Sequence, residues 1–436
     1  MEQPQERISE TSAAQPCPGG CSEYHALSRR GFLGRGAGVT AAAVVAPAWV
    51  PRVGMSPNGP ARDVLLNVYL RGGMDALTAV PPYGEPELYV QRPNVAVPPP
   101  GGANTALDLD GFFGLAPAAA PLLTPWSDGK LAIVHACGSP LGSRSHFDEQ
   151  AFWELGIPGQ PLGTETSGWL ARHLQNEPPV QLTPLRAAAM ERLMPRVLVE
   201  APDTLPLGEP ATFRLPGNPA TEAARRSTIE AMYAGVSPPL GSAALSTFDV
   251  IDLLATINFE NYQPANGAVY PETVFGRKIR NAAALIKAQV GVEAIAVDLD
   301  GWDHHDTQGP LDGVFAALMG DLALTLEAFY LDMGLGMDGV VVAVQSEFGR
   351  RLAENGSLGT DHGYGGALFV MGGHVNGGQV ITNWPGLDPG VLVGGDLGIT
   401  IDYRDVLGEI LAVRMASSRL DLVFPNYTPT FPGVVF

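Results

Sequence analysis

Histidines and carboxylates gather in a few short segments of this chain. In chain order these segments are residues 71–75, 144–148, 298–306, and 346–350 together with 359–363. Neutral imidazole and carboxylate oxygen are the usual protein ligands for zinc, manganese and iron. The residue types therefore favour a site for one or two divalent metal ions. A two-metal centre can generate hydroxide and clamp a tetrahedral transition state.

The spacing inside two of these segments fits a role as metal ligands. Asp303 and His305 are two residues apart, so on an extended segment their side chains point to the same side. Asp361 and His362 are adjacent, and in a turn flanked by glycine they can diverge to hold one ion or two neighbouring ions. Simpler explanations remain open at this point. Residues 303–306 could form a solvated loop or helix cap, and an Asp-His-Gly sequence is also a common turn.

Short apolar runs precede most of the polar segments. They cover residues 65–70, 131–134, 196–199, 294–297, 340–344 and 368–371. Continuous β-branched runs of this length are typical of strands buried on both faces of a parallel sheet. Helical periodicity predicts helices over residues 221–234, 245–258, 271–289, 311–331 and 403–415. The alternation predicts an α/β fold with a mostly parallel central sheet and helices on both of its faces.

The positions of the histidines connect the polar segments to this sheet. Ligands of open α/β sheets bind at the carboxyl ends of the strands. Five of the eight histidines fall at or just beyond predicted strand ends, and these are His135, His146, His305, His362 and His374. We therefore expect segments that are distant in the sequence to meet at one edge of the sheet. For His374, a glycine-rich turn without a ligand role is the simpler expectation.

Composition and charge exclude several classes of protein. The chain has 436 residues, with 45 acidic and 26 basic side chains and a formal net charge of −19. Duplex nucleic acid is an unfavourable partner, because affinity for it depends on Lys and Arg that neutralise phosphates. Three cysteines cannot build a disulfide scaffold of this length. The 53 glycines and 39 prolines indicate a globular protein with many loops.

The first 48 residues have the pattern of an export signal. Arg29 and Arg30 precede an apolar stretch over residues 36–45, and Ala46-Pro47-Ala48 provides a site for cleavage. This pattern is typical of a twin-arginine signal peptide, which predicts the twin-arginine translocase as a partner and a periplasmic or extracellular location. Acidic and basic residues balance within 1–48, so the whole charge of −19 belongs to residues 49–436. We expect no stable membrane span, since no later stretch looks long and apolar enough.

The motifs together resemble a known family, the twin-arginine-exported family called domain of unknown function 1501, which is similar to the alkaline phosphatase and sulfatase superfamily. The matching pieces run in family order and are Leu70-Arg71-Gly72-Gly73-Met74-Asp75, Arg144-Ser145-His146-Phe147-Asp148, Gly301-Trp302-Asp303-His304-His305, Ser346-Glu347-Phe348-Gly349-Arg350 and Gly359-Thr360-Asp361-His362-Gly363. The resemblance implies an alkaline-phosphatase-like three-layer sandwich formed by one domain over residues 49–436, with a Pro-rich insertion around 156–220.

The resemblance also implies a set of site residues. Asp303 and His305 match one metal-binding pair of the superfamily, and Asp361 and His362 match the adjacent Asp-His pair. Asp75 follows the first predicted strand, where the superfamily places an acidic ligand. Three further positions are implied by the motifs: His146 as a ligand, Glu347 as a ligand or a group behind one, and Arg71 as a catalytic candidate.

A nucleophile is harder to identify from the sequence. The sulfatase pattern Cys-x-Pro-x-Arg is absent, because Cys137-Gly138-Ser139-Pro140 has the wrong spacing. Gly-x-Ser-x-Gly is also absent, which disfavours an ordinary α/β-hydrolase. Ser145, Ser143 and Thr78 are candidate nucleophiles, and we take Ser145 with Arg71 and Glu347 as the catalytic candidates.

These features predict an exported metal-dependent hydrolase of phosphate or sulfate esters, acting on a small molecule or a polymer. The divalent metal could be zinc, manganese, calcium or magnesium. Two alternatives share the same fold. One is a non-catalytic exported scaffold for binding or for the cell surface, which the missing nucleophile favours, and the other is a metal-dependent mutase.

Overall fold

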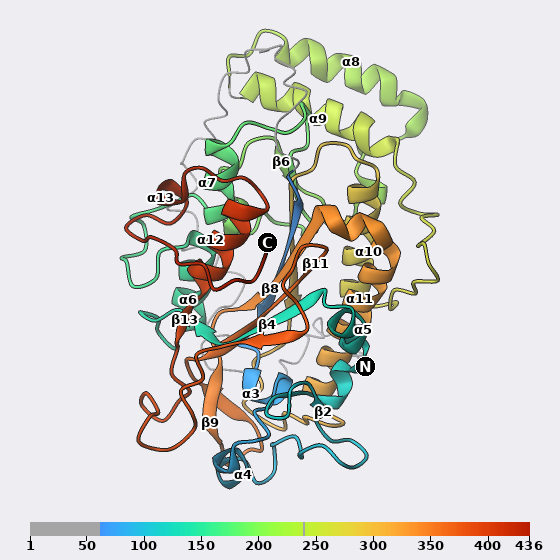
Figure 1. The fold of residues 1–436 in the computed structure, drawn as a ribbon. Coiled ribbons are helices and arrows are strands. Elements are labelled where there is room, and N and C mark those ends of the chain that lie inside the picture. The colour runs from blue at the N-terminus through green and yellow to red at the C-terminus, as the bar shows by residue number, and fades with distance from the viewer. Residues whose placement is uncertain (1–61, 239) are drawn as a thin grey trace, which may run out of the picture.

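A sheet of nine strands runs through the middle of the protein, between two layers of helices (Figure 1). The computed structural model describes residues 62–238 and 240–436. The predicted signal peptide over residues 1–48 lies outside these described residues. The mixed α/β architecture agrees with the fold class expected from the alternation of apolar runs and helical patterns.

The sheet has the strand order β12-β4-β11-β8-β1-β7-β5-β6, and β13 also pairs with β4. Its strands are β1 (Val64–Arg71), β4 (Leu131–Gly138), β5 (Ala187–Ala189), β6 (Thr204–Pro206), β7 (Ala294–Asp300), β8 (Val340–Ser346), β11 (Gly366–Gly372), β12 (Gln379–Ile381) and β13 (Ile401–Asp402). Only β11 runs against its neighbours, β4 and β8, and every other pairing in the sheet is parallel. The expectation of a mostly parallel sheet is confirmed.

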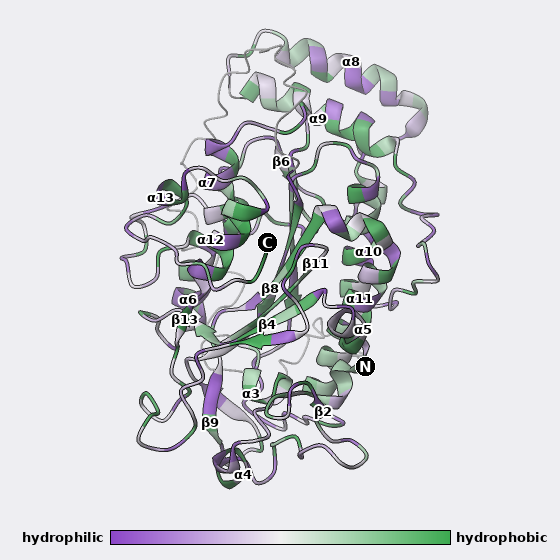
Figure 2. Ribbon diagram, in the orientation of Figure 1, coloured by the Kyte–Doolittle hydropathy of each residue, from purple (hydrophilic) through white to green (hydrophobic). Residues whose placement is uncertain are grey.

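Alternate side chains of each central strand enter two separate cores. In β1, Leu66 and Val68 belong to the core on one face, while Leu65 and Tyr69 belong to the core on the other. Burial on both faces explains why the central strands are mostly apolar, as their colour in Figure 2 also shows. The first face is covered by α5 (Leu123–Ser127), α10 (Val274–Lys287) and α11 (Val314–Met333), and the second by α6 (His146–Leu155), α7 (Trp169–Asn176), α12 (Tyr403–Val413) and α13 (Leu420–Val423).

The remaining elements lie around this sandwich. A helical hairpin of α8 (Glu222–Tyr233) and α9 (Leu240–Ala255) projects from one end of it, and α8 buries none of its residues (Figure 1). The smaller elements are α3 (Ala76–Ala79), α4 (Pro86–Gln91), the pairs β2 (Leu107–Asp108) with β3 (Gly114–Leu115) and β9 (Arg350–Glu354) with β10 (Thr360–His362), and the 3-10 helices η1 (Pro117–Leu122), η2 (Arg196–Leu198), η3 (Pro210–Thr212), η4 (Pro219–Thr221) and η5 (Gly334–Gly339).

One predicted strand is wrong. Within the run 196–199, the residues Arg196–Leu198 form the 3-10 helix η2 instead, directly after Pro195. Proline lacks the N–H that a central strand needs, so the apolar run is not sufficient evidence there. The sheet extends on this side through β5 and β6, which lie within the Pro-rich stretch 156–220. That stretch therefore contributes strands to the central sheet.

A second correction concerns the length of the apolar segments that follow the predicted signal peptide. Among the described residues, one segment, Val314–Gly339, is long and apolar enough to cross a membrane by length and composition alone. The prediction that no such stretch follows residue 48 is wrong in that respect. In this fold α11 packs against α10 and η1, with Phe315, Met319 and Leu322 fully buried. Burial in the core accounts for the apolar residues on the inner face of this helix, and 44% of the apolar window as a whole is buried.

Candidate metal centre

The candidate centre lies beyond the carboxyl ends of β1, β7 and β8. The loop after β7 provides Asp303 and His305, β10 provides His362, and the first residue of α6 provides His146. Gly72, in the turn after β1, has a φ of +120°, and a Cβ there would lie 2.6 Å from the backbone nitrogen of Asp303. Glycine therefore lets the β1 turn approach the β7 loop closely enough to complete the site.

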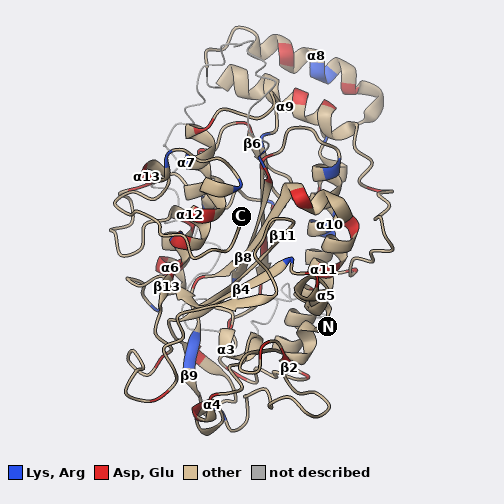
Figure 3. Cartoon of the chain, viewed as in Figure 1, with Lys and Arg blue, Asp and Glu red and all other residues tan. Residues whose placement is uncertain are grey.

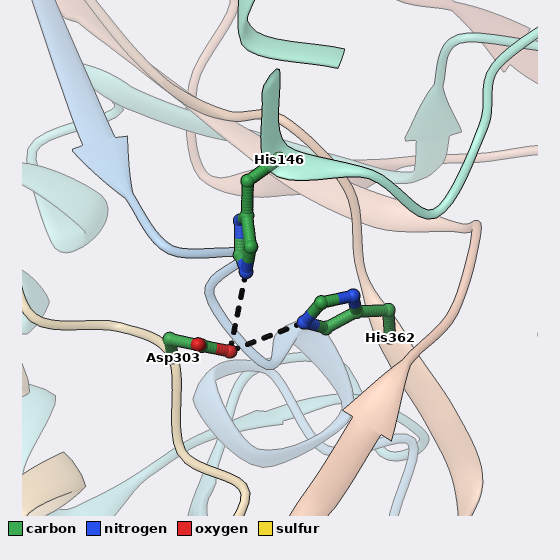
Figure 4. A group of neighbouring side chains, drawn as sticks. All are labelled: His146, Asp303 and His362. Carbon is green, nitrogen blue, oxygen red and sulfur yellow. Dashed lines mark hydrogen bonds and ion pairs between the residues drawn. The ribbon is translucent and has the colours of Figure 1, made fainter. Parts of the chain in front are cut away.

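Three imidazole nitrogens converge on one carboxylate oxygen. The Nε2 atoms of His305, His362 and His146 lie 3.1, 3.2 and 3.3 Å from Oδ1 of Asp303. The Nε2 atoms of His305 and His362 are 2.9 Å apart. Figure 4 shows His146 and His362 pointing at the Asp303 carboxylate from different elements. The ligand atoms of His146, Asp303 and His362 form a group compact enough to hold a metal ion.

The opposite nitrogen of each ring faces a hydrogen-bond acceptor. Nδ1 of His146 lies 2.9 Å from Oε1 of Glu347, and Nδ1 of His305 lies 2.9 Å from Oδ1 of Asp361. Nδ1 of His362 lies 2.7 Å from the backbone oxygen of Arg144. A carbonyl or ionised carboxylate can only accept, so each Nδ1 carries the proton. This assignment leaves the lone pair of each neutral ring on Nε2, aimed at Asp303.

Charged partners keep these acceptors ionised. Burial acts to raise the pKa of Asp303, but its contacts with the three histidines and the charge of Arg350 hold it well below its usual value. Arg350 is fully buried, and its Nη2 donates to Oδ1 of Asp303 at 2.7 Å. Burial also acts to raise the pKa of Glu347, and the hydrogen bond from His146 outweighs it and lowers the pKa.

The charge state of the histidines differs from ring to ring. Burial acts to lower the pKa of His146, yet its hydrogen bonds to Asp303 and Glu347 outweigh this and raise the pKa to about 9. Burial lowers the pKa of His362, which favours the neutral form of that ring. The site therefore attracts a cation to the Nε2 edge of its rings, and either a proton or a metal ion meets that need.

The residues present fit a metal ion. When every Nδ1 carries its proton, the lone pairs of His305 and His362 face each other at 2.9 Å, and both face an anionic oxygen. Such lone pairs repel unless a cation lies between them. Atoms bound tetrahedrally at about 2.0–2.1 Å from zinc lie roughly 3.3 Å apart. The separations of 2.9–3.3 Å between each ring and Asp303, and between His305 and His362, are close to that edge length. The ligand atoms that all lie near one another belong to His146, Asp303 and His362.

Two of the predicted site residues lie behind the rings. Glu347 is fully buried and accepts hydrogen bonds from the Gly72 N–H and from Gln150 as well as contacting His146. Asp361, with its side chain 52% exposed, contacts the far nitrogen of His305. Both carboxylates are thus placed to fix a ring tautomer and orientation, which is the usual arrangement behind metal-binding histidines.

Asp75, Thr78 and Arg71 lie outside the group of converging ligand atoms. Asp75 and Arg92 form a buried ion pair of 2.6 Å, and Thr78 donates a hydrogen bond to the same carboxylate. Arg71 binds the carboxylates of Glu154 and Asp298, each at 3.0 Å.

The two candidate serines stand at the entrance to α6. Ser145 is the residue before His146, at the cap position of the helix, and its backbone N–H donates to Oγ of Ser143 at 3.0 Å. This position brings Ser145 next to the metal-binding group through the chain itself. No hydrogen bond in the described residues links either hydroxyl to a base.

Of the five histidines predicted at strand ends, three meet at the centre and two do not. His135 is buried inside β4, its Nε2 3.1 Å from the Val80 oxygen, and burial lowers its pKa to about 4. His374 packs against the ring of Phe436. His304, next to two site residues, is buried against Trp302 and Phe315.

Sequence patterns missed two contributors. Arg350 is a buried group that donates to Asp303 and to the backbone oxygens of Gly73 and Thr360. The motif at residues 346–350 contains this arginine but does not show its partner. Arg144 acts on His362 through its backbone oxygen, for which a side-chain pattern offers no signal.

The fold and the centre together define an α/β protein with a histidine-rich candidate metal site at the carboxyl edge of its sheet. The chain belongs to the family described as "Protein of unknown function (DUF1501)", which matches residues 137–394. That match spans the four converging residues from His146 to His362. No curated protein matches the chain.

Several solved structures have distant overall similarity. One is Ps i-CgsB, with 13% identity and a TM-score of 0.34, covering 85% of this chain and 75% of that chain. Ps i-CgsB in complex with k-i-k-neocarrahexaose has 12% identity with the same TM-score and coverage. The PH0037 protein from Pyrococcus horikoshii has 12% identity and a TM-score of 0.29, covering 72% of this chain and 87% of that chain. Likeness at this level defines neither a fold family nor a function.

Proposed function

We propose that this protein is an exported metal-dependent hydrolase of phosphate or sulfate esters. One observation carries the proposal, namely that three histidines have their Nδ1 atoms on acceptors while their Nε2 atoms meet at Oδ1 of Asp303. His146, His305, His362 and Asp303 would hold the ion. The proposal includes an alkaline-phosphatase-like arrangement of the sandwich, which the sequence resemblance supports.

The donor set favours particular metals among those considered. Three imidazoles and one carboxylate suit zinc or manganese. Calcium and magnesium prefer shells made of oxygen, so three nitrogen donors disfavour them. We therefore expect zinc or manganese at this site.

Each residue around the ion has a separate task. A bound divalent ion polarises an ester oxygen and lowers the pKa of a bound water. Glu347 and Asp361 hold two of the rings in the tautomer that presents Nε2. Arg350 keeps Asp303 ionised. Ser145 directly precedes His146, so it is the candidate nucleophile closest in sequence to a proposed ligand. A water molecule could act as the nucleophile in its place.

The proposed cellular context follows from residues 1–48. Their arginine pair, apolar stretch and Ala-x-Ala site support export by the twin-arginine translocase to the periplasm or the exterior. This route carries proteins that are already folded, which suits a protein with a bound metal. No nucleic acid partner is expected for a chain with this negative charge.

The test combines metal analysis with an ester panel. We expect purified protein to hold a divalent ion in near-stoichiometric amount, and His305→Ala and His362→Ala to lose most of it. His374→Ala is the matched control, because that ring lies outside the centre, and it should keep the ion. Metal content that is negligible in the wild type, or unaffected by the first two variants, contradicts the metal site.

The ester panel separates the functional alternatives. Turnover of a phosphate or sulfate ester that disappears in His362→Ala supports the hydrolase. A fully metal-loaded protein that hydrolyses no ester of the panel indicates the exported scaffold, and isomerisation of a phosphosugar without net hydrolysis indicates a mutase.

A further inference from the structure

Two partly exposed arginines beside the centre share one buried carboxylate. Arg144 and Arg351 have side-chain exposures of 35% and 39%, whereas Asp396 is completely buried. Nη2 of Arg144 donates to Oδ2 of Asp396, and Nε of Arg351 donates to Oδ1 at 3.2 Å. The carboxylate thus holds the two guanidinium groups close to each other at the surface.

Both arginines are tied to the candidate centre by the backbone. The backbone oxygen of Arg144 accepts the hydrogen bond from Nδ1 of His362. Arg351 directly follows Arg350, whose Cα pairs with that of His362 across β9 and β10. Figure 3 shows the basic residues on β9, in a chain whose net charge is −19. The pair therefore places two positively charged side chains next to the metal ligands.

The hydrogen-bond donors of this group are not all used within the described residues. Two guanidinium groups share one buried carboxylate, and the partly exposed Asp361 is a further acidic neighbour of Arg351. Each guanidinium has five N–H donors. Besides Asp396, Arg351 donates to the Gly394 oxygen at 2.9 Å, and Arg144 stacks on Tyr364 with 4.7 Å to the ring centroid. Nε of Arg144 is buried and has no hydrogen-bond partner among the described residues.

We propose that Arg144 and Arg351, positioned by Asp396, form a subsite that binds the anionic oxygens of the substrate beside the metal centre. Guanidinium groups bind tetrahedral oxyanions through paired, charge-assisted hydrogen bonds. The inference rests on the proposed function and narrows its substrate class to esters that carry a free negative charge. Uncharged carboxylic esters are then poor substrates. Asp396 is a positioning residue, since it acts through the two arginines.

The test measures binding of inorganic phosphate and sulfate by calorimetry, with metal-loaded and with EDTA-treated protein. Arg351→Gln should weaken binding by about tenfold to a hundredfold, the loss expected for a hydrogen bond to a charged group. Arg351→Lys keeps the charge without the planar fork and should fall between Arg351→Gln and the wild type. Arg226→Gln is the matched control, because Arg226 forms an exposed ion pair with Asp252 on the distant α8–α9 hairpin and should leave binding unchanged.

A combined variant protects the test against misfolding. Removing both arginines would leave Asp396 buried without a counter-charge, so the variant Arg144→Gln/Arg351→Gln/Asp396→Asn neutralises all three together. With far-UV circular dichroism unchanged, it should lose anion binding in both metal states. Binding that persists in this variant, or that vanishes with EDTA and is indifferent to the arginines, overturns the subsite. The metal content of the same samples tests the proposed function separately. If the purified protein holds no metal but its anion binding still depends on Arg351, the subsite is supported and the metal-dependent hydrolase is refuted.

Discussion

Glu347→Gln is the sharpest perturbation of the proposed centre, because it changes a charge and almost nothing else. Glu347 is fully buried, and its Oε1 contacts Nδ1 of His146 and accepts from the Gly72 N–H at 2.7 Å and from Gln150 at 2.9 Å. The oxygen of a glutamine can accept the same bonds. Its amide nitrogen would replace Oε2, which lies 3.3 Å from Oγ of Ser346. We expect the variant to fold.

The expected effect is a loss of metal affinity. The carboxylate raises the basicity of the ring that it holds, and partners of this kind are worth about 10–100-fold in metal affinity. That factor corresponds to about 1.4–2.7 kcal/mol. Asp361→Asn removes the equivalent partner of His305, but Asp361 is 52% exposed. Solvent screens its charge, so the loss in that variant should be smaller than in Glu347→Gln.

Competition with a chromophoric chelator measures both affinities at one pH, and thermal unfolding of the chelated proteins confirms that each variant is folded. The reasoning predicts an order, with the wild type binding most tightly, Asp361→Asn next and Glu347→Gln least. Equal affinity in Glu347→Gln and the wild type would refute the role assigned to the carboxylate. So would a larger loss in Asp361→Asn, because burial then has no bearing on the strength of the contact.

Two further predictions concern buried carboxylates that the centre does not use as ligands. Burial raises the pKa of Glu149 to about 8, so between about pH 4.5 and pH 8 the folded chain holds a proton that the unfolded chain has lost, and stability falls as pH rises through this window. Glu149→Gln should remove this pH dependence and raise the free energy of unfolding by roughly 3 kcal/mol at pH 7. Urea unfolding at pH 5, 7 and 8 measures the effect, and the same pH dependence in both proteins would contradict the prediction. Asp75→Ala leaves Arg92 buried without its counter-charge and should cost about 3–5 kcal/mol of unfolding free energy with unchanged metal content. Loss of the metal from folded Asp75→Ala would instead make Asp75 a ligand.

The fold was predictable where burial alone decides the structure. The runs at 294–297 and 340–344 are apolar at every position, and the run at 65–70 is apolar apart from Asn67, because β1, β7 and β8 are covered on both faces. The sequence carries that information directly. The direction of a strand is not encoded in the same way. The run at 368–371 looks the same as the others, yet β11 is antiparallel to β4 and β8, because the direction depends on how the chain returns to the sheet.

The candidate site was predictable in its residue types but not in their roles. Spacing predicted two pairs, Asp303 with His305 and Asp361 with His362, and the motif predicted His146. The Nε2 atoms of the three histidines meet at Asp303, whereas Asp361 contacts the far nitrogen of His305. Which ring nitrogen faces the centre depends on the partner of the other nitrogen. For His362 that partner is a backbone oxygen, which every residue possesses, so no pattern of side chains can reveal it.

Part of the net charge of −19 comes from carboxylates near the centre, and the structure shows what each of them contacts. A buried carboxylate needs a counter-charge or hydrogen bonds, since its desolvation costs several kcal/mol. Asp303 has Arg350 and the three rings, and Glu347 has His146 with two further donors. Only one of the carboxylates at this edge is therefore placed as a ligand, while Glu347 and Asp361 act on imidazoles. Negative charge gathered in this way strengthens neutral nitrogen donors, and it leaves Arg144 and Arg351 as the positive groups available to an anionic substrate.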